Sequence, residues 1–132
     1  MIAELPSIKV MYVVSQKGVS GAQSAFNVLE SKLPTLKGRK FYGAVFGIPP
    51  NEEYWACIEL ASGDVPETWG FKTGTIPGGK YEQERINNWN DNMNLIGEAF
   101  ERLSKDNTVD RSRPQIEFYR SMRDMLVRVP IK

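Results

Sequence analysis

The hydrophobic pattern of this chain switches between a two-residue and a helical repeat in the same order in each half, and this restricts the folds it can adopt. Six segments are rich in β-branched and aromatic residues, which predicts strands. Pro77-Gly78-Gly79 interrupts the fourth segment and predicts a bulge or kink there. The six segments are 8–14, 40–47, 53–60, 71–86, 115–119 and 125–129.

The first predicted helix follows the first strand. Its apolar stripe has helical spacing and ends before Pro34, which cannot continue a helix. Ser20 followed three residues later by Gln23 predicts a capping box at its start. The stripe consists of Ala22, Phe26, Leu29 and Leu33.

The second predicted helix lies between the fourth and fifth strands. Asn90 or Asp91 is suited to cap its first turn, and Asp106-Asn107 marks its end. Its apolar stripe is Leu95, Ile96, Ala99, Phe100 and Leu103.

The element order is therefore strand-helix-strand-strand, followed by the same order again. We expect one α+β domain over residues 1–132, with repeats at about 8–60 and 70–130. The halves share no residue pattern, so the repeat is one of element order. An antiparallel sheet with two helices on one face would bury both apolar stripes. The length of 132 residues suits a single domain with its own core.

The composition excludes several kinds of chemistry. With no histidine, the chain cannot form a Ser-His or Cys-His pair, and with one cysteine it cannot form a thiolate zinc cluster or an intrachain disulfide. We therefore expect no metal and no cofactor. The net charge of +1 provides no field that would hold nucleic acid or anionic lipid.

The same features suggest where the protein resides. A single cysteine, Cys57, suits the reducing cytoplasm, and residues 1–6 lack a basic-then-apolar leader pattern. No apolar run approaches the roughly 18–20 residues that span a bilayer. We expect a cytoplasmic protein without a membrane partner.

Three motifs in the second half carry a resemblance to a known family. They are Ile-Pro-Gly-Gly-Lys-Tyr at 76–81, Pro-x-x-Glu-x-Tyr at 114–119 and Val-Pro-Ile at 129–131. As a set they resemble the gyrase-inhibitor-like effector-binding domain. That module occurs at the C-terminus of AraC-type and MerR-type transcription activators and as freestanding proteins. The resemblance implies duplicated strand-helix-strand-strand units with a central ligand cleft.

The resemblance also implies a site. The glutamate of Pro-x-x-Glu-x-Tyr maps onto Glu117 and the tyrosine onto Tyr119. In the family this glutamate lies in the cleft among aromatic rings, and multidrug-sensing members bind lipophilic cations there. Some freestanding members instead hydrolyse cyclopropane-containing compounds. The chain lacks the regulators' DNA-binding domain, so we expect no direct contact with nucleic acid.

The sequence departs from the family pattern at two places. Residues 82–85 read Glu-Gln-Glu-Arg where the family has an apolar strand. The family's His-x-Gly turn is replaced by residues 86–90, where Asn88 is suited to the left-handed conformation of the glycine.

The residues themselves leave the role of Glu117 open. On a strand, Gln115, Glu117 and Tyr119 point one way and Ile116 and Phe118 the other. If the second pair forms the core, Glu117 is a solvated surface residue. If Glu117 is buried instead, its charge requires a partner, which a cationic ligand would supply.

Aromatic residues are the other candidate ligand contacts. Faces of aromatic rings attract delocalised cations, with about 1–2 kcal/mol for a desolvated contact. The alternative is that each ring simply belongs to the core. The candidates, beside Glu117 and Tyr119, are Tyr42, Tyr54, Trp55 and Trp89.

Three further groups have a functional and a plainer interpretation. Glu59 would be the second member of a carboxylate pair with Glu117, or a solvated strand residue. Cys57 is expected to be a buried small hydrophobe. The arginines of the C-terminal part are expected to form a solvated edge, with an anionic partner as the alternative. These are Arg111, Arg113, Arg120, Arg123 and Arg128.

Three functions follow as hypotheses. The first is a module that binds a lipophilic, cationic or aromatic small molecule without chemistry, with Glu117 as charge partner. The second is a cofactor-free hydrolase of strained electrophiles, with Glu117 as general base and Tyr119 as acid. The third is a protein partner role of the gyrase-inhibitor type, for which the sequence offers no distinguishing feature.

Overall fold

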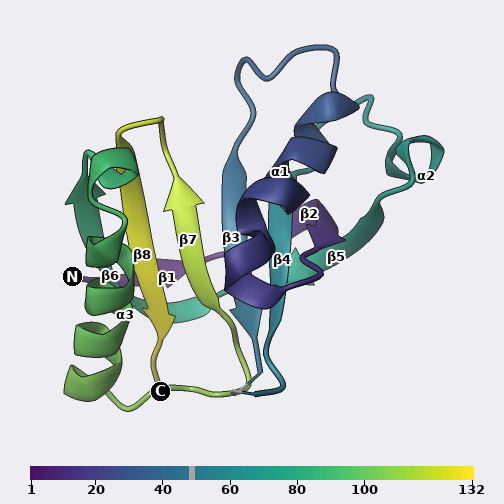
Figure 1. The fold of residues 1–132 in the computed structure, drawn as a ribbon. Helices are drawn as coiled ribbons and strands as arrows, with labels where there is room; N and C mark the ends of the chain where they lie inside the picture. The colour runs from purple at the N-terminus through teal and green to yellow at the C-terminus, as the bar shows by residue number, and fades with distance from the viewer. Residues whose placement is uncertain (48–49) are drawn as a thin grey trace.

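The computed structural model describes residues 1–47 and 50–132, and Figure 1 shows its architecture. Eight strands form one antiparallel sheet in the order β1-β6-β8-β7-β3-β4-β2-β5. The α+β class and the antiparallel sheet are therefore as predicted. The strands are β1 (Ile2–Leu5), β2 (Ile8–Val14), β3 (Phe41–Phe46), β4 (Glu53–Glu59), β5 (Lys72–Ile76), β6 (Gly79–Asn87), β7 (Gln115–Tyr119) and β8 (Asp124–Pro130).

Two elements escaped the sequence analysis. Strand β1 has only four residues and lies at the edge of the sheet beside β6. The short helix α2 (Pro66–Trp69) has proline in its first turn and ends at Gly70, whose φ of 82° lies in the left-handed region that favours glycine. Neither segment is long enough to display a repeat.

The helices begin differently from the predictions. A 3-10 turn, η1 (Gly18–Gly21), precedes α1 (Ala22–Ser31), and the Ser20 hydroxyl donates to the carbonyl of Lys17. The predicted capping box is therefore wrong, because the Ser20 hydroxyl bonds within the 3-10 turn and does not cap the helix. A second 3-10 turn, η2 (Trp89–Asp91), occupies the predicted cap of the second helix. That helix, α3 (Asn94–Asp106), starts later.

The turn before η2 follows the expectation for its asparagine. Asn88 has φ 54° and ψ 43°. It is the one non-glycine residue with positive φ in the described chain. Asparagine tolerates this conformation better than most residues do, so it stands where a glycine would otherwise be needed.

Both long helices lie on one face of the sheet (Figure 1). Helix α1 packs on β2 and β4 through Ala25 and Leu29, and α3 packs on β6 and β8 through Ile96, Ala99 and Leu103. This confirms most of each predicted stripe. Leu95 is the exception, because it is exposed. None of the helices in the described chain has the length and apolar character that crossing a bilayer needs.

The helix-free face of the sheet holds a third apolar cluster. It joins strands from both ends of the sheet and contains Cys57, which is fully buried as predicted. The sheet thus has a core on each face, which is why β4 buries residues on both sides. The cluster consists of Val10, Tyr42, Ala44, Cys57, Ile76, Tyr81 and Ile116.

Candidate functional site

Glu117 lies in β7, near the middle of the sheet, on the face that carries the helices. Its neighbours in register are Gly43 on β3 and Val127 on β8. Its side chain is only 6% exposed, so it is a buried carboxyl group and not a solvated strand residue. Burial of a charge at such a position is costly unless other groups compensate it.

Two tyrosine hydroxyls provide part of that compensation. The Tyr54 hydroxyl donates to Oε1 of Glu117 over 2.6 Å, and the Tyr119 hydroxyl donates to the same oxygen over 2.7 Å. Oε2 accepts no hydrogen bond from the residues that the structure describes, and none of their basic side chains forms an ion pair with the carboxylate. The group has donors on one oxygen and no counter-charge.

A glycine makes this arrangement sterically feasible. Tyr54 belongs to β4 and Glu117 to β7, and β3 runs between them. At Gly43 of β3, an added Cβ would overlap both the Tyr54 hydroxyl and Oε1 of Glu117. Any other residue at this position would therefore push the two side chains apart.

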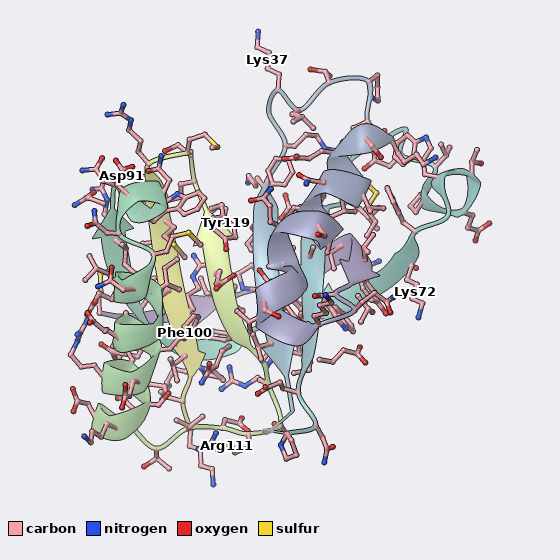
Figure 2. All side chains as sticks on the ribbon, viewed as in Figure 1. Lys37, Lys72, Asp91, Phe100, Arg111 and Tyr119 are labelled. Atoms are coloured by element: carbon pink, nitrogen blue, oxygen red, sulfur yellow. The ribbon has the colours of Figure 1, made fainter. Side chains whose placement is uncertain are left out.

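Further aromatic rings pack against the two tyrosines that hold the carboxyl group. The Tyr119 ring contacts Phe26 of α1 edge-on, with centroids 5.6 Å apart, and Trp89 of η2, with centroids 5.0 Å apart. Figure 2 labels Tyr119, which lies on β7 between the two helices. Phe26 also meets the ring of Tyr54 edge-on at 6.5 Å. The site therefore includes residues from α1 and from the turn η2 that precedes α3.

The environment shifts the pKa values of the three hydrogen-bonded groups. Burial raises the pKa of Glu117 above its usual range, although the two tyrosine hydroxyls work in the opposite direction. Burial, followed by the adjacent carboxylate, also raises the pKa of Tyr54 and of Tyr119. The tyrosines consequently stay protonated and act as donors to Glu117.

The structure brings together four of the candidate residues and separates two. Tyr54, Trp89 and Tyr119 gather around Glu117. Tyr42 and Trp55 lie on the helix-free face, where Tyr42 stacks on Phe118 with centroids 4.7 Å apart.

Trp55 occupies a separate stack on that helix-free face. It stacks on Tyr12 with centroids 3.7 Å apart, and its indole nitrogen donates to Glu53. Glu59 alternates to the same face and pairs with Lys40 at 3.8 Å. It therefore forms no pair with Glu117.

Two hollows lie away from Glu117. One, of about 230 Å³, lies beside the β3–β4 connection and is lined in part by Arg111, Arg113 and Gln115. The other, of about 250 Å³, is an open depression on the outer side of α3. The carboxyl group itself is buried and lines neither hollow. Within the described residues, no cluster of acidic or thiol groups is arranged to hold a metal ion.

Sequence reasoning missed two members of this site. Phe26 appeared only as part of a helical stripe, although it turns an edge toward Tyr54 and Tyr119. Gly43 lies inside a predicted strand, and a glycine at such a position often marks a close approach of other groups. The glycine was visible in the sequence, but the sequence did not show which groups approach it.

Comparison with known proteins places the fold. No protein-family model matches the sequence, and no curated protein matches it. Solved structures do. An integron cassette protein from the mobile metagenome of Vibrio cholerae superposes with a TM-score of 0.76 at 13% identity, over 100% of this chain and 95% of the other. The chain shares this fold.

Two further structures have the same fold. SAV2435, solved bound to tetraphenylphosphonium, has a TM-score of 0.65 at 12% identity and covers 100% of this chain and 93% of its own. A hydrolase from Listeria innocua has a TM-score of 0.57 at 10% identity, and the match covers 100% of this chain and 91% of the hydrolase. One of these proteins binds a lipophilic cation, and the other is described as an enzyme.

Proposed function

We propose that the protein binds a small lipophilic cation at Glu117. The observation that carries this proposal is a buried carboxyl group with two hydroxyl donors on Oε1 and no cationic partner. A bound cation would supply the missing counter-charge, and the rings of Phe26, Tyr119 and Trp89 would contact its apolar surface. The complex of SAV2435 with tetraphenylphosphonium supports the ligand class.

We further propose that the site is a cleft between two duplicated units of an effector-binding domain of the gyrase-inhibitor-like type. The strand order supports this division. Counted outward from the β7–β3 junction, the strands are β7-β8-β6 on one side and β3-β4-β2 on the other, so each unit places its second, third and first strand in the same order. Glu117 lies at that junction, facing Gly43. In this proposal the protein acts in the cytoplasm and does not contact nucleic acid directly.

Entry of the ligand requires side chains to move. The carboxyl group is 6% exposed, so the rings that cover it must turn before a cation reaches Oε2. Trp89 is the mobile candidate, because it lies in a short 3-10 turn and is held by one hydrogen bond from its indole to the carbonyl of Ser121.

Titration with tetraphenylphosphonium, followed by tryptophan fluorescence at about pH 8, tests the proposal. We expect Glu117→Gln to weaken binding by roughly tenfold or more, because it removes the negative charge that would balance the cation, and two unit charges about 6 Å apart attract by about 3 kcal/mol at an effective dielectric constant of about 20. Glu59→Gln is the matched control, since Glu59 pairs with Lys40 on the opposite face, and it should bind as wild type does. Equal affinity in all three proteins would refute the role of Glu117.

Hydrolysis is a second candidate function, favoured by the Listeria innocua hydrolase of the same fold and by the raised pKa of Glu117. Glu117 would take a proton from water as the water oxygen bonds to a carbon of a strained ring. The ring C–C bond would break, and the carbon that keeps the electron pair would take a proton from Tyr119, which Glu117 would then reprotonate. The net reaction adds one water molecule.

Turnover distinguishes the two functions. Incubation with an activated cyclopropane compound should yield a ring-opened product carrying one added water, at a rate lost in Glu117→Gln. A protein that binds tetraphenylphosphonium but leaves the cyclopropane intact would be a binding module alone.

A further inference from the structure

Arg128 is a second buried charge, on the opposite side of the sheet from Glu117. It lies in β8, where Leu126, Arg128 and Pro130 alternate toward the helix-free face while Met125, Val127 and Val129 pack under α3. Its side chain is 7% exposed. The expectation that the C-terminal arginines form a solvated edge is therefore wrong for this residue.

The guanidinium of Arg128 has few partners. Nε donates to Oε1 of Gln83 over 3.0 Å, and no other hydrogen bond of its side chain reaches a residue that the structure describes. No aspartate or glutamate in that part of the chain forms an ion pair with it. The carboxylates of β6 face away, since Glu84 pairs with Arg102 of α3 and Glu82 with the amino group of Met1.

The two terminal nitrogens of Arg128 are nevertheless not sealed inside the protein. Among the described residues, the one side-chain polar atom that is both fully enclosed and unpaired is Nε of Arg39. Nη1 and Nη2 of Arg128 have no hydrogen-bond partner among these residues, so they are not fully enclosed. They present a flat edge with free N–H donors, which matches the two oxygens of a carboxylate.

An aromatic stack holds this edge in place. The guanidinium lies over the ring of Phe118, 5.0 Å from its centroid, and Tyr42 stacks on Phe118. Burial lowers the pKa of Arg128, which reflects its poor solvation. The positive charge of Arg120 also lowers the pKa of Arg128, and Arg120 shares the carboxylate of Asp124 with Arg85, at 3.5 and 2.8 Å.

We propose that this patch, defined by Gln83, Phe118 and Arg128, binds a small organic carboxylate. The carboxylate would accept hydrogen bonds from Nη1 and Nη2 of Arg128 and supply the counter-charge that the protein lacks there. A single negative charge suits one buried guanidinium. An apolar or aromatic body suits the surrounding rings better than the hydration shell of a phosphate dianion does. The patch is separate from Glu117 because the two side chains occupy opposite faces of the sheet.

NMR titration of the wild-type protein with benzoate, at constant ionic strength set by chloride, is the direct test. We expect backbone shifts to cluster at residues 83, 118 and 128 and to saturate, with acetate weaker and inorganic phosphate weaker still. Shifts scattered over exposed lysines and arginines, or phosphate binding more tightly than benzoate, would overturn the assignment.

Variants then separate this patch from the Glu117 site. Benzoate should bind at least tenfold more weakly to Arg128→Gln, and Arg128→Lys should also lose affinity, because an ammonium lacks the planar pair of donors. Arg102→Gln is the matched control, since Arg102 is an exposed arginine of α3, and it should bind as wild type does. Glu117→Gln should likewise leave benzoate binding intact. Unchanged affinity in Arg128→Gln would exclude the site.

Discussion

Glu117 and Arg128 lie on neighbouring strands near the middle of the same sheet, and each is more than nine-tenths buried. They differ in how the fold accommodates them. Glu117 receives two hydroxyl donors across a strand that is opened by Gly43. Arg128 receives one amide oxygen and the face of Phe118. Neither is paired with the other, because one faces the helices and the other faces away.

The difference shows two ways to hold an unpaired charge. The carboxyl group can protonate, and its raised pKa moves it toward the neutral form. A guanidinium has no such route, because its pKa remains far above neutrality even when lowered. We therefore expect Glu117 to respond to pH and Arg128 to respond to anions. The following predictions test that contrast, starting with the largest effect.

Substitution of Gly43 by valine should cause the greatest loss. The new side chain would overlap the Tyr54 hydroxyl and the Glu117 carboxylate, and overpacking together with a broken buried hydrogen bond costs about 2–4 kcal/mol. Urea unfolding followed by circular dichroism measures the change. Gly97→Ala in α3, where an added Cβ meets nothing, should instead stabilise the protein by about 0.5–1 kcal/mol. Equal effects in both variants would contradict the role of Gly43.

Removal of the Tyr54 hydroxyl should have the next largest effect. Tyr54→Phe leaves the buried carboxylate with one donor instead of two, at a cost of about 1–3 kcal/mol. It should also raise the pKa of Glu117 further. Tyr12→Phe, on the other face, is the control, and its stability should stay within about 0.5 kcal/mol of wild type. Carboxyl chemical shifts measured against pH would report the pKa.

The stability of the protein should decline as pH rises above the ordinary pKa of Glu117. In that window the folded protein holds a proton that the unfolded chain has released, so raising the pH favours unfolding. Asp64 and Asp110 act in the opposite sense and at lower pH, because their folded pKa values are lowered, that of Asp110 to about 2. The difference between wild type and Glu117→Gln isolates the contribution of Glu117. A difference that does not change with pH would contradict it.

Replacement of Arg128 by methionine should change the free energy of unfolding least, and it should stabilise the protein where the other substitutions destabilise it. An apolar chain of similar length removes an uncompensated charge, so we expect a gain of about 1 kcal/mol in buffers without organic anions. Addition of benzoate should stabilise wild type and leave Arg128→Met unchanged. Thermal unfolding scans measure both. A loss of several kcal/mol would indicate that Arg128 is already compensated within the protein.

The sequence predicts the sheet better than it predicts the site. Periodicity locates β2 and β7 at their observed bounds, since a two-residue repeat reflects local geometry. The same alternation correctly groups Glu117 with Tyr119. It does not reveal that Tyr54 reaches over Gly43, because that contact depends on the order of β4, β3 and β7 in the sheet.

The two faces explain the remaining errors. The arginines of the C-terminal part were assigned as a group to a solvated edge, and this is wrong for Arg128, which is buried. Because the sheet has a core on both faces, alternation decides which residues share a side but not which side is buried. Tyr42 and Trp55 were grouped with Glu117 because of their aromatic character, but they lie on the helix-free face.

The buried position of Cys57 allows chemical labelling of its thiol to report how often the sheet opens. The single thiol lies in the central strand β4, fully covered by the cluster on the helix-free face, and burial raises its pKa. A thiol reagent can therefore modify it only when this part of the sheet opens. The rate of labelling in native buffer would report how often the sheet opens, and benzoate or tetraphenylphosphonium should slow it to the extent that either ligand binds the closed form.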